Sequence, residues 1–348
     1  MNVTRTTPPR PVDVAAVFPG LAPLARTATR LHPRPGAPSV HDSSVGGPLL
    51  WPADEPWPHC DAPHEGGGES LDAVRVERRA RARRALLPED APQVSDYTPE
   101  DEEILARIDW DAEWPDGPVP MLPVAQLYVR DVPVLRPPAG ADLLQVLWCP
   151  FDHPEEMHMP RTAVFWRSTA DVADILTSPP EPSVVAYEEY VPEPCLLAPE
   201  QVTEYPSPTE LSGELREQLG DWSRWQAAGA DVDSSPAPYL ESFYHRELSV
   251  APGWKAGGWP QWGYTDPSPR LCPACGTGMD ALLTIATFEW DSSNRGWIPY
   301  EDQAGASSDE YRYRDLGQPT AIQIGGGHKQ QLYVCPAAPE HPHIELMQ

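Results

Sequence analysis

Cysteine and histidine residues form two groups whose spacing suits metal binding. In the C-terminal part of the sequence, the Cys-x-x-Cys pair Cys272 and Cys275 is followed by Cys335 and by two histidines, His341 and His343. Thiolate and imidazole groups are preferred zinc ligands, and a tetrahedral site needs four of them, usually as two close pairs that folding brings together. We therefore predict a structural zinc site formed by Cys272, Cys275, Cys335 and His341, with His343 as the alternative fourth ligand.

The N-terminal part of the sequence carries a similar group. Its members are Cys60, His64, Cys149 and His153. A proline occupies the position that corresponds to the second cysteine of the Cys-x-x-Cys pair, and His64 follows it directly. Since imidazole can replace thiolate as a zinc ligand, this group predicts a second zinc site.

Three other interpretations of these residues are open. A Cys-x-x-Cys pair can be a thioredoxin-like redox centre, but that centre needs a helix directly after it, whereas Gly276 and Gly278 favour a turn. The cysteines could also be small buried side chains that bind no metal. If the N-terminal group supplied only three ligands, the open fourth position would be that of a metal-dependent enzyme.

The segments around the two groups repeat in the same order. Each group has one cysteine after a Gly-Gly block and another at the end of a β-like run, followed by proline. The repeated blocks are residues 45–48 with 256–259, 121–127 with 279–285, and 145–150 with 331–336. These three blocks, together with the cysteine that follows the first of them (Cys60 or Cys272), match in one order and indicate an internal duplication.

Composition and turn signals suggest how the elements are organised. The 46 prolines among 348 residues exclude a chain of long helices and favour short strands and ordered loops. We predict an α+β, β-dominated fold in which two small antiparallel-sheet repeats carry inserted helices and loops. The predicted parts are an N-terminal extension (1–40), repeat 1 (41–177, with a charged insert at 65–120), a Pro- and Glu-rich connection (178–238) and repeat 2 (239–348).

The charge balance restricts the class of partner. The sequence has 25 lysine and arginine residues against 52 aspartate and glutamate residues, a formal net charge of −27. Binding to a phosphate backbone needs clustered positive charge, so we expect no nucleic-acid partner. The arginine-rich run at 75–84 is interpreted as a solvated helix that pairs with acidic neighbours. The acidity instead favours a basic polypeptide partner through electrostatic steering.

Targeting signals are absent from the sequence as given. No run of about 18 apolar residues predicts a membrane-spanning helix, and no apolar region of a signal peptide follows the first residues. We therefore expect a cytoplasmic protein without a membrane partner. In that compartment the six cysteines are thiols or metal ligands and not disulfides.

Tryptophans cluster around the two Gly-Gly blocks. They have two interpretations, an aromatic cradle for a Pro-rich or extended peptide and ordinary core packing. The candidate binding residues are Trp51, Trp57, Trp254, Trp259 and Trp262. No P-loop, dinucleotide fingerprint, nucleophile elbow or metalloprotease motif accompanies them.

The repeated blocks together resemble a known family. "PGWKAGGWPQW", "CPACG", "MDALLTI" and "LYVC" resemble the YwqG-like bacterial domain of unknown function, which is related to the programmed cell death protein 2 family. The resemblance covers residues 251–335 well and 45–149 more weakly. It implies a non-enzymatic protein-binding role, since eukaryotic relatives are chaperones for a basic ribosomal protein and some bacterial members lie near toxin systems. The incomplete set of Cys-x-x-Cys pairs and the charged insert depart from the family pattern.

These observations give one prediction of function and one alternative. We expect a zinc-stabilised, non-enzymatic module that engages a basic or Pro-rich polypeptide, in a chaperone-like or immunity-like role. The alternative is a metal-dependent enzyme with an open zinc position in the N-terminal repeat.

Overall fold

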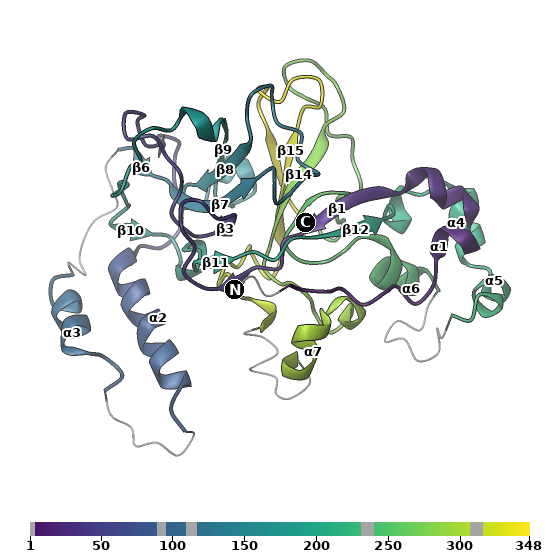
Figure 1. Ribbon diagram of the computed structural model, residues 1–348, viewed down its shortest axis with the longest axis horizontal. Coiled ribbons are helices and arrows are strands. Elements are labelled where there is room, and N and C mark those ends of the chain that lie inside the picture. The colour runs from purple at the N-terminus through teal and green to yellow at the C-terminus, as the bar shows by residue number, and fades with distance from the viewer. Residues whose placement is uncertain (1–3, 89–94, 109–116, 231–239, 307–315) are drawn as a thin grey trace.

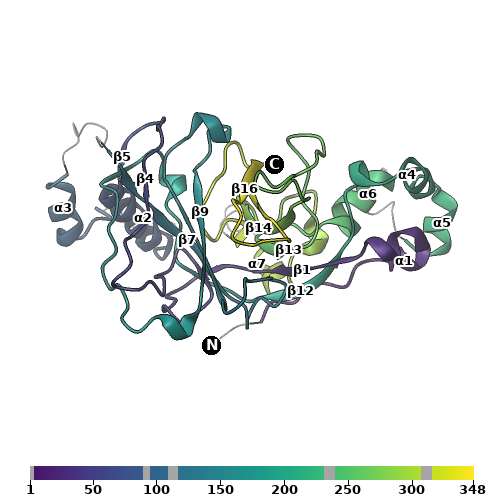
Figure 2. The same ribbon diagram turned by 90° about the horizontal axis from the view of Figure 1, so that it is seen from above.

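Two antiparallel sheets of six strands each form the centre of the molecule and share one hydrophobic core (Figures 1 and 2). The computed structural model describes residues 4–88, 95–108, 117–230, 240–306 and 316–348. Helices α2 and α3 lie at one end of the molecule, and α1, α4, α5 and α6 lie at the other (Figure 2). The predicted α+β, β-dominated class is confirmed.

The strands of each large sheet come from distant parts of the sequence. The N-terminal sheet has the order β2 (Arg34–Pro35), β11 (Cys195–Leu196), β3 (Ser44–Val45), β7 (Leu122–Tyr128), β8 (Leu143–Trp148) and β9 (Thr162–Arg167). The C-terminal sheet has the order β12 (Glu200–Glu204), β1 (Arg26–Arg30), β13 (Lys255–Gly257), β14 (Asp280–Ala286), β15 (Lys329–Val334) and β16 (Ile344–Met347). Two small pairs join β4 (His59–Cys60) to β6 (Val119–Pro120) and β5 (Glu69–Ser70) to β10 (Val184–Val185).

Short helices fill the remaining segments. The α-helices are α1 (Val14–Val17), α2 (Leu71–Ala85), α3 (Pro99–Leu105), α4 (Gly213–Leu219), α5 (Trp222–Ala227), α6 (Leu240–Phe243) and α7 (Tyr300–Ala306), and a π-helical turn, η6 (Tyr244–Ser249), continues α6. The 3-10 turns are η1 (Pro19–Leu24), η2 (Pro154–Glu156), η3 (Thr169–Asp171), η4 (Glu188–Tyr190), η5 (Pro208–Glu210) and η7 (Arg295–Trp297).

The charged insert of repeat 1 forms the helices α2 and α3. The arginines of α2 pair with acidic neighbours, as predicted: Arg75 with Glu181, Arg81 with Glu188, and Arg79 and Arg83 with Asp101. Ser70 caps the start of α2 and Thr98 caps the start of α3, each accepting a backbone N–H. The parts of the insert at 89–94 and 109–116 lie outside the described residues.

The two large sheets share a strand pattern. In each sheet a short strand (β3 or β13), a long one (β7 or β14), a third (β8 or β15) and an edge strand (β9 or β16) pair in sequence order. The register shifts between Pro123 and Ala125 in the first sheet and between Ala281 and Leu283 in the second, which are corresponding positions in the repeated blocks. The internal duplication stays a prediction, and the matching bulges agree with it.

Two short connections exchange strands between the sheets. β1 of the C-terminal sheet leads through residues 31–33 into β2 of the N-terminal sheet, and β11 leads through residues 197–199 into β12. The N–H of Ala198 donates to the carbonyl of Leu31 at 3.0 Å, so the connections lie against each other. Both read Leu-x-Pro. Segments that the sequence assigned to an N-terminal extension and to a connection thus complete the two sheets.

Residues 320–326, which read TAIQIGG, form no strand. Ile322 and Ile324 are buried in the core, but Ala321 has a φ of +54° and only an isolated bridge from Ile324 to His328 is present. The backbone therefore turns into β15 and does not add a strand to the sheet.

One of the connections holds a buried histidine that makes stability depend on pH. Burial and the nearby Arg30 guanidinium lower the pKa of His32 from 6.5 to about 4, although Glu200 lies 3.2 Å from its Nε2 atom. The unfolded chain therefore binds a proton near pH 6.5 that the folded chain does not bind until about pH 4.

We expect the free energy of unfolding to fall by up to about 3 kcal/mol between these pH values, and the fall to be smaller in His32→Asn. Asparagine suits the φ of +46° at this position. Urea unfolding of both proteins from pH 7 to pH 4 measures the difference, in which acid effects elsewhere cancel. Parallel curves would contradict the assignment.

Candidate metal centres

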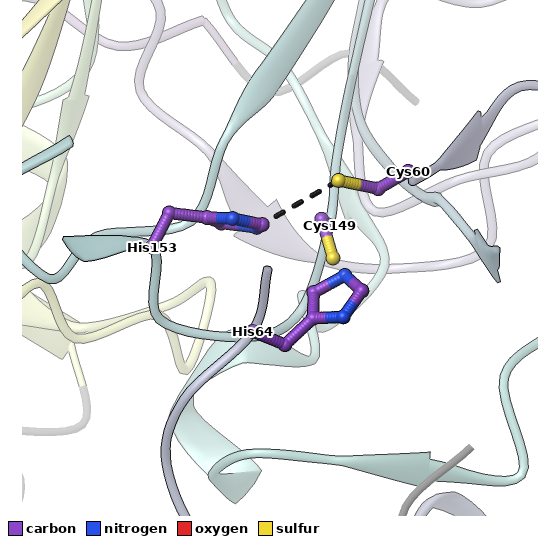
Figure 3. A group of neighbouring side chains, drawn as sticks. All are labelled: Cys60, His64, Cys149 and His153. Carbon is purple, nitrogen blue, oxygen red and sulfur yellow. Dashed lines mark hydrogen bonds between the residues drawn. The ribbon is translucent and has the colours of Figure 1, made fainter. Parts of the chain in front are cut away.

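The four residues of the N-terminal group converge from separate segments (Figure 3). Cys60 ends β4, His64 lies in the loop after it, Cys149 directly follows β8, and His153 lies in the turn after that strand. Cys60, Cys149 and His153 are buried, and His64 is half-buried. The structure thus brings together all four residues predicted for this site.

Backbone hydrogen bonds fix the two loops of this cluster. The N–H and carbonyl of Glu65 bond with those of Asp152, which joins the loop that carries His64 to the turn that carries His153. The N–H of Cys149 donates to the carbonyl of Arg161 at 2.9 Å, so its position continues the ladder between β8 and β9. Backbone hydrogen bonds therefore fix the positions from which the four side chains of the cluster project.

The distances in the N-terminal cluster suit a tetrahedral ion. All four donor atoms lie within 4.8 Å of one another, and Sγ of Cys60 lies 3.8 Å from Nε2 of His153. Zinc bonds of about 2.3 Å to sulfur and about 2.0 Å to nitrogen imply ligand separations of about 3.3 to 3.8 Å. Nε2 of His64 is buried without a hydrogen-bond partner among the described residues, and an ion bound through this atom would satisfy it.

The two thiols of this cluster differ in proton affinity. A hydrogen bond from Cys149, with a further one from His153, holds the pKa of the Cys60 thiol far below its ordinary value of 9.0. The same contact with Cys60, together with burial, raises the pKa of Cys149. The two thiols share a proton through this contact, and a bound cation would displace it.

The C-terminal cluster is built on a tight turn. The N–H of Gly276 donates to the carbonyl of Cys272 at 2.8 Å, and the N–H of Cys272 donates to the carbonyl of Thr277 at 2.8 Å. Gly276 has a φ of +72°, which glycine adopts without strain. The turn aims Cys272 and Cys275 to one side, and no helix follows it before β14. The predicted turn is confirmed, and the redox motif with a helix after the cysteine pair does not form.

Two further residues at the same end of the C-terminal sheet complete this cluster. Cys335 directly follows β15, and its Sγ lies 3.5 Å from that of Cys275. Nδ1 of His341 lies 3.4 Å from Sγ of Cys272, and the four donor atoms lie within 4.8 Å of one another. His343 instead places its Nε2 2.9 Å from the Thr162 hydroxyl. His341 is therefore the fourth member of the group.

The C-terminal cluster is more exposed than the N-terminal one. Cys275 is exposed and His341 half-buried, while Cys272 and Cys335 are buried. Hydrogen bonds from Thr277, with smaller contributions from Cys335 and Cys272, lower the pKa of the Cys275 thiol to about 6. A thiol that is ionised at neutral pH is a ready cation ligand. Both groups can therefore hold a metal ion.

Burial favours core packing over a peptide cradle for the predicted tryptophans. Trp51, Trp57, Trp254 and Trp262 are buried, and the Arg26 guanidinium lies 3.7 Å above the ring of the half-buried Trp259. Trp51 and Trp57 pack against each other with ring centroids 5.1 Å apart. Core packing therefore accounts for four of these rings, and the fifth, Trp259, stacks against an arginine. Cys195 is likewise a core thiol, bonded to the carbonyl of Pro319.

Sequence reasoning missed a buried ion pair beside the Gly-Gly block of the C-terminal half. Nζ of Lys255 lies 2.7 Å from both carboxylate oxygens of Glu204, and neither side chain is exposed. The N–H groups of Ala251 and Trp259 also donate to this carboxylate. The pair explains the lysine before the two glycines as a structural residue that ties β13 to β12 across β1.

Comparison with known proteins identifies no relative of this chain. The sequence matches no protein-family model and no curated protein to a significant degree. The resemblance to the YwqG-like domain thus stays a prediction. No helix in the described part of the chain is long and apolar enough to cross a membrane.

Proposed function

We propose that this chain is a non-enzymatic protein-binding module of the YwqG-like type, in which two structural zinc ions stabilise the sheets and an acidic surface engages a basic or Pro-rich polypeptide. The observation that carries the proposal is the convergence of four Cys and His donors in each half. Four protein ligands fill a tetrahedral zinc site and leave no position for water or substrate.

The donor types favour zinc over other ions. The N-terminal cluster offers two thiols and two imidazoles, and the C-terminal cluster offers three thiols and one imidazole. Magnesium and calcium prefer oxygen ligands, whereas closed Cys2His2 and Cys3His sets are typical of structural zinc. The enzyme alternative needs an open ligand position in the N-terminal cluster, and the convergence of His64 and His153 with both cysteines argues against one.

The binding part of the proposal is supported by charge. A net charge of −27 raises the local concentration of cationic segments and speeds their association. The arginines of α2 are already engaged by carboxylates, so that helix offers little free positive charge to an acidic partner.

Elemental analysis of tag-free protein tests the metal part. We expect about two zinc ions per chain, falling to about one in Cys272→Ser and in Cys149→Ser, because each variant loses one ligand of one cluster. Cys195→Ser is the matched control and should keep both ions, since Cys195 is buried but belongs to neither cluster. A chain that binds no zinc would refute the proposed metal sites.

The client part is tested by crosslinking followed by mass spectrometry. We expect basic polypeptides to be captured by the wild-type chain at physiological salt. A small molecule that copurifies with the chain, in the absence of any polypeptide client, would overturn the binding-module proposal and favour an enzyme.

A further inference from the structure

The N-terminal sheet ends in a long edge strand. Among the strands that the structure describes, β9 pairs only with β8, and it is the longest of the four edge strands of the two large sheets. The N–H of Cys149 donates to the carbonyl of Arg161. Because bonded positions alternate in an antiparallel ladder, the backbone groups of Thr162, Val164 and Trp166 point away from β8.

Only the first part of this edge is closed. The N–H of Thr162 donates to the Glu345 carboxylate at 3.2 Å, and its hydroxyl donates to the same carboxylate at 2.6 Å. No described residue forms a hydrogen bond with the outward backbone groups of Val164 or Trp166. Such groups are a template for an added strand.

A cavity of about 470 Å³ lies at the open end of this edge. Its lining residues include Trp166 and three acidic residues, Asp54, Glu55 and Asp171. Arg167 binds Glu55, while Asp54 and Asp171 are exposed and form no ion pair with another described residue. An indole beside free carboxylates suits a guanidinium or ammonium group.

We propose that β9 and this cavity bind an extended basic peptide. The peptide adds a strand to β9 through the outward groups of Val164 and Trp166, and one of its arginine or lysine side chains enters the cavity beside Asp54 and Asp171. This inference rests on the proposed function and specifies where the basic client binds. Charge complementarity selects this occupant over an acidic or neutral segment.

The experiment uses a fluorescein-labelled peptide of alternating arginine and valine and the full zinc-loaded chain. Fluorescence anisotropy at physiological salt gives the Kd of the peptide. We expect Asp54→Asn/Asp171→Asn to weaken binding by about tenfold or more. The matched control, Glu69→Gln/Glu214→Gln, removes the same charge from exposed positions elsewhere and should change the Kd by about twofold or less.

A second pair of variants tests the strand edge. Val164→Pro removes the outward N–H without removing a ladder bond, so the sheet should remain folded while peptide binding is lost. Val164→Thr keeps the N–H and should bind like the wild type. Circular dichroism and zinc content confirm folding of each variant.

The outcomes separate this site from the proposed function. If Asp54→Asn/Asp171→Asn and the control Glu69→Gln/Glu214→Gln weaken peptide binding equally, the proposed site is wrong. The proposal of a basic client would then still stand. Absence of binding to the wild type would overturn both. A wild-type dimer that Val164→Pro converts to a monomer would show that a second copy of the chain occupies the edge, which also overturns the proposed peptide site.

Discussion

Replacing Cys149 by serine is expected to release the ion of the N-terminal cluster and to lower the free energy of unfolding by about 4 kcal/mol or more. Cys149 is fully buried, directly after the end of β8 and before the turn that carries His153. Losing this ligand frees both loops from the ion and leaves a hydroxyl in an apolar site. Urea unfolding with zinc analysis of the same samples measures both effects.

Two comparisons make this prediction specific. Cys195→Ser places the same hydroxyl at another fully buried cysteine that is not a ligand, so it isolates the cost of burying serine. Cys275→Ser removes an exposed ligand of the C-terminal cluster and should cost less than Cys149→Ser, since its side chain packs against less of the core. Equal destabilisation by Cys149→Ser and Cys195→Ser, with zinc content unchanged, would refute a structural ion at this cluster.

Breaking the buried ion pair of the C-terminal sheet is expected to have a comparable effect. Glu204→Gln removes the charge that Lys255 faces at 2.7 Å in a site without solvent. Burial lowers the pKa of Lys255, and the Glu204 carboxylate opposes this by stabilising the ammonium. Without that carboxylate the buried ammonium is unpaired, which costs about 3 to 5 kcal/mol of folding free energy. Chemical denaturation at pH 7 measures the loss.

A double-mutant cycle tests whether the two groups act as a pair. Glu204→Gln/Lys255→Met removes both charges and should be more stable than Glu204→Gln alone. The single Lys255→Met leaves a carboxylate that still accepts two backbone N–H groups, so its cost should be the smaller of the two single changes. Additive losses in the cycle would contradict direct coupling between the side chains.

The metal clusters were the most predictable part of the molecule. Cys and His are rare in this sequence, and their places at the ends of β-like runs limit which of them can meet. The choice between His341 and His343 was not predictable, because both follow Cys335 at short distance. It depends on Thr162, a residue of the other sheet that binds His343.

The exchanged strands and the buried ion pair could not be predicted from sequence patterns, for physical reasons. β2 and β11 span two residues each, too few to show a period of two. Glu204 lies in an acidic segment that resembles surface, and its burial follows only from the pairing of β12 with β1. The tryptophans allowed two interpretations for another reason, since a core cluster and a ligand cradle have the same composition.

The exchange of strands between the sheets also governs how the chain matures during synthesis. Arg30, near the start of the sequence, pairs with Glu200 on one side and with Lys255 on the other. At about 5 to 20 residues per second, a translating ribosome delivers the second partner on the order of ten seconds or more after the first strand has emerged. During that interval β1 has open hydrogen-bonding groups on both edges and is exposed to aggregation. The strands of the C-terminal sheet run from β1 to β16, so this sheet cannot be completed until nearly the whole chain has emerged from the ribosome.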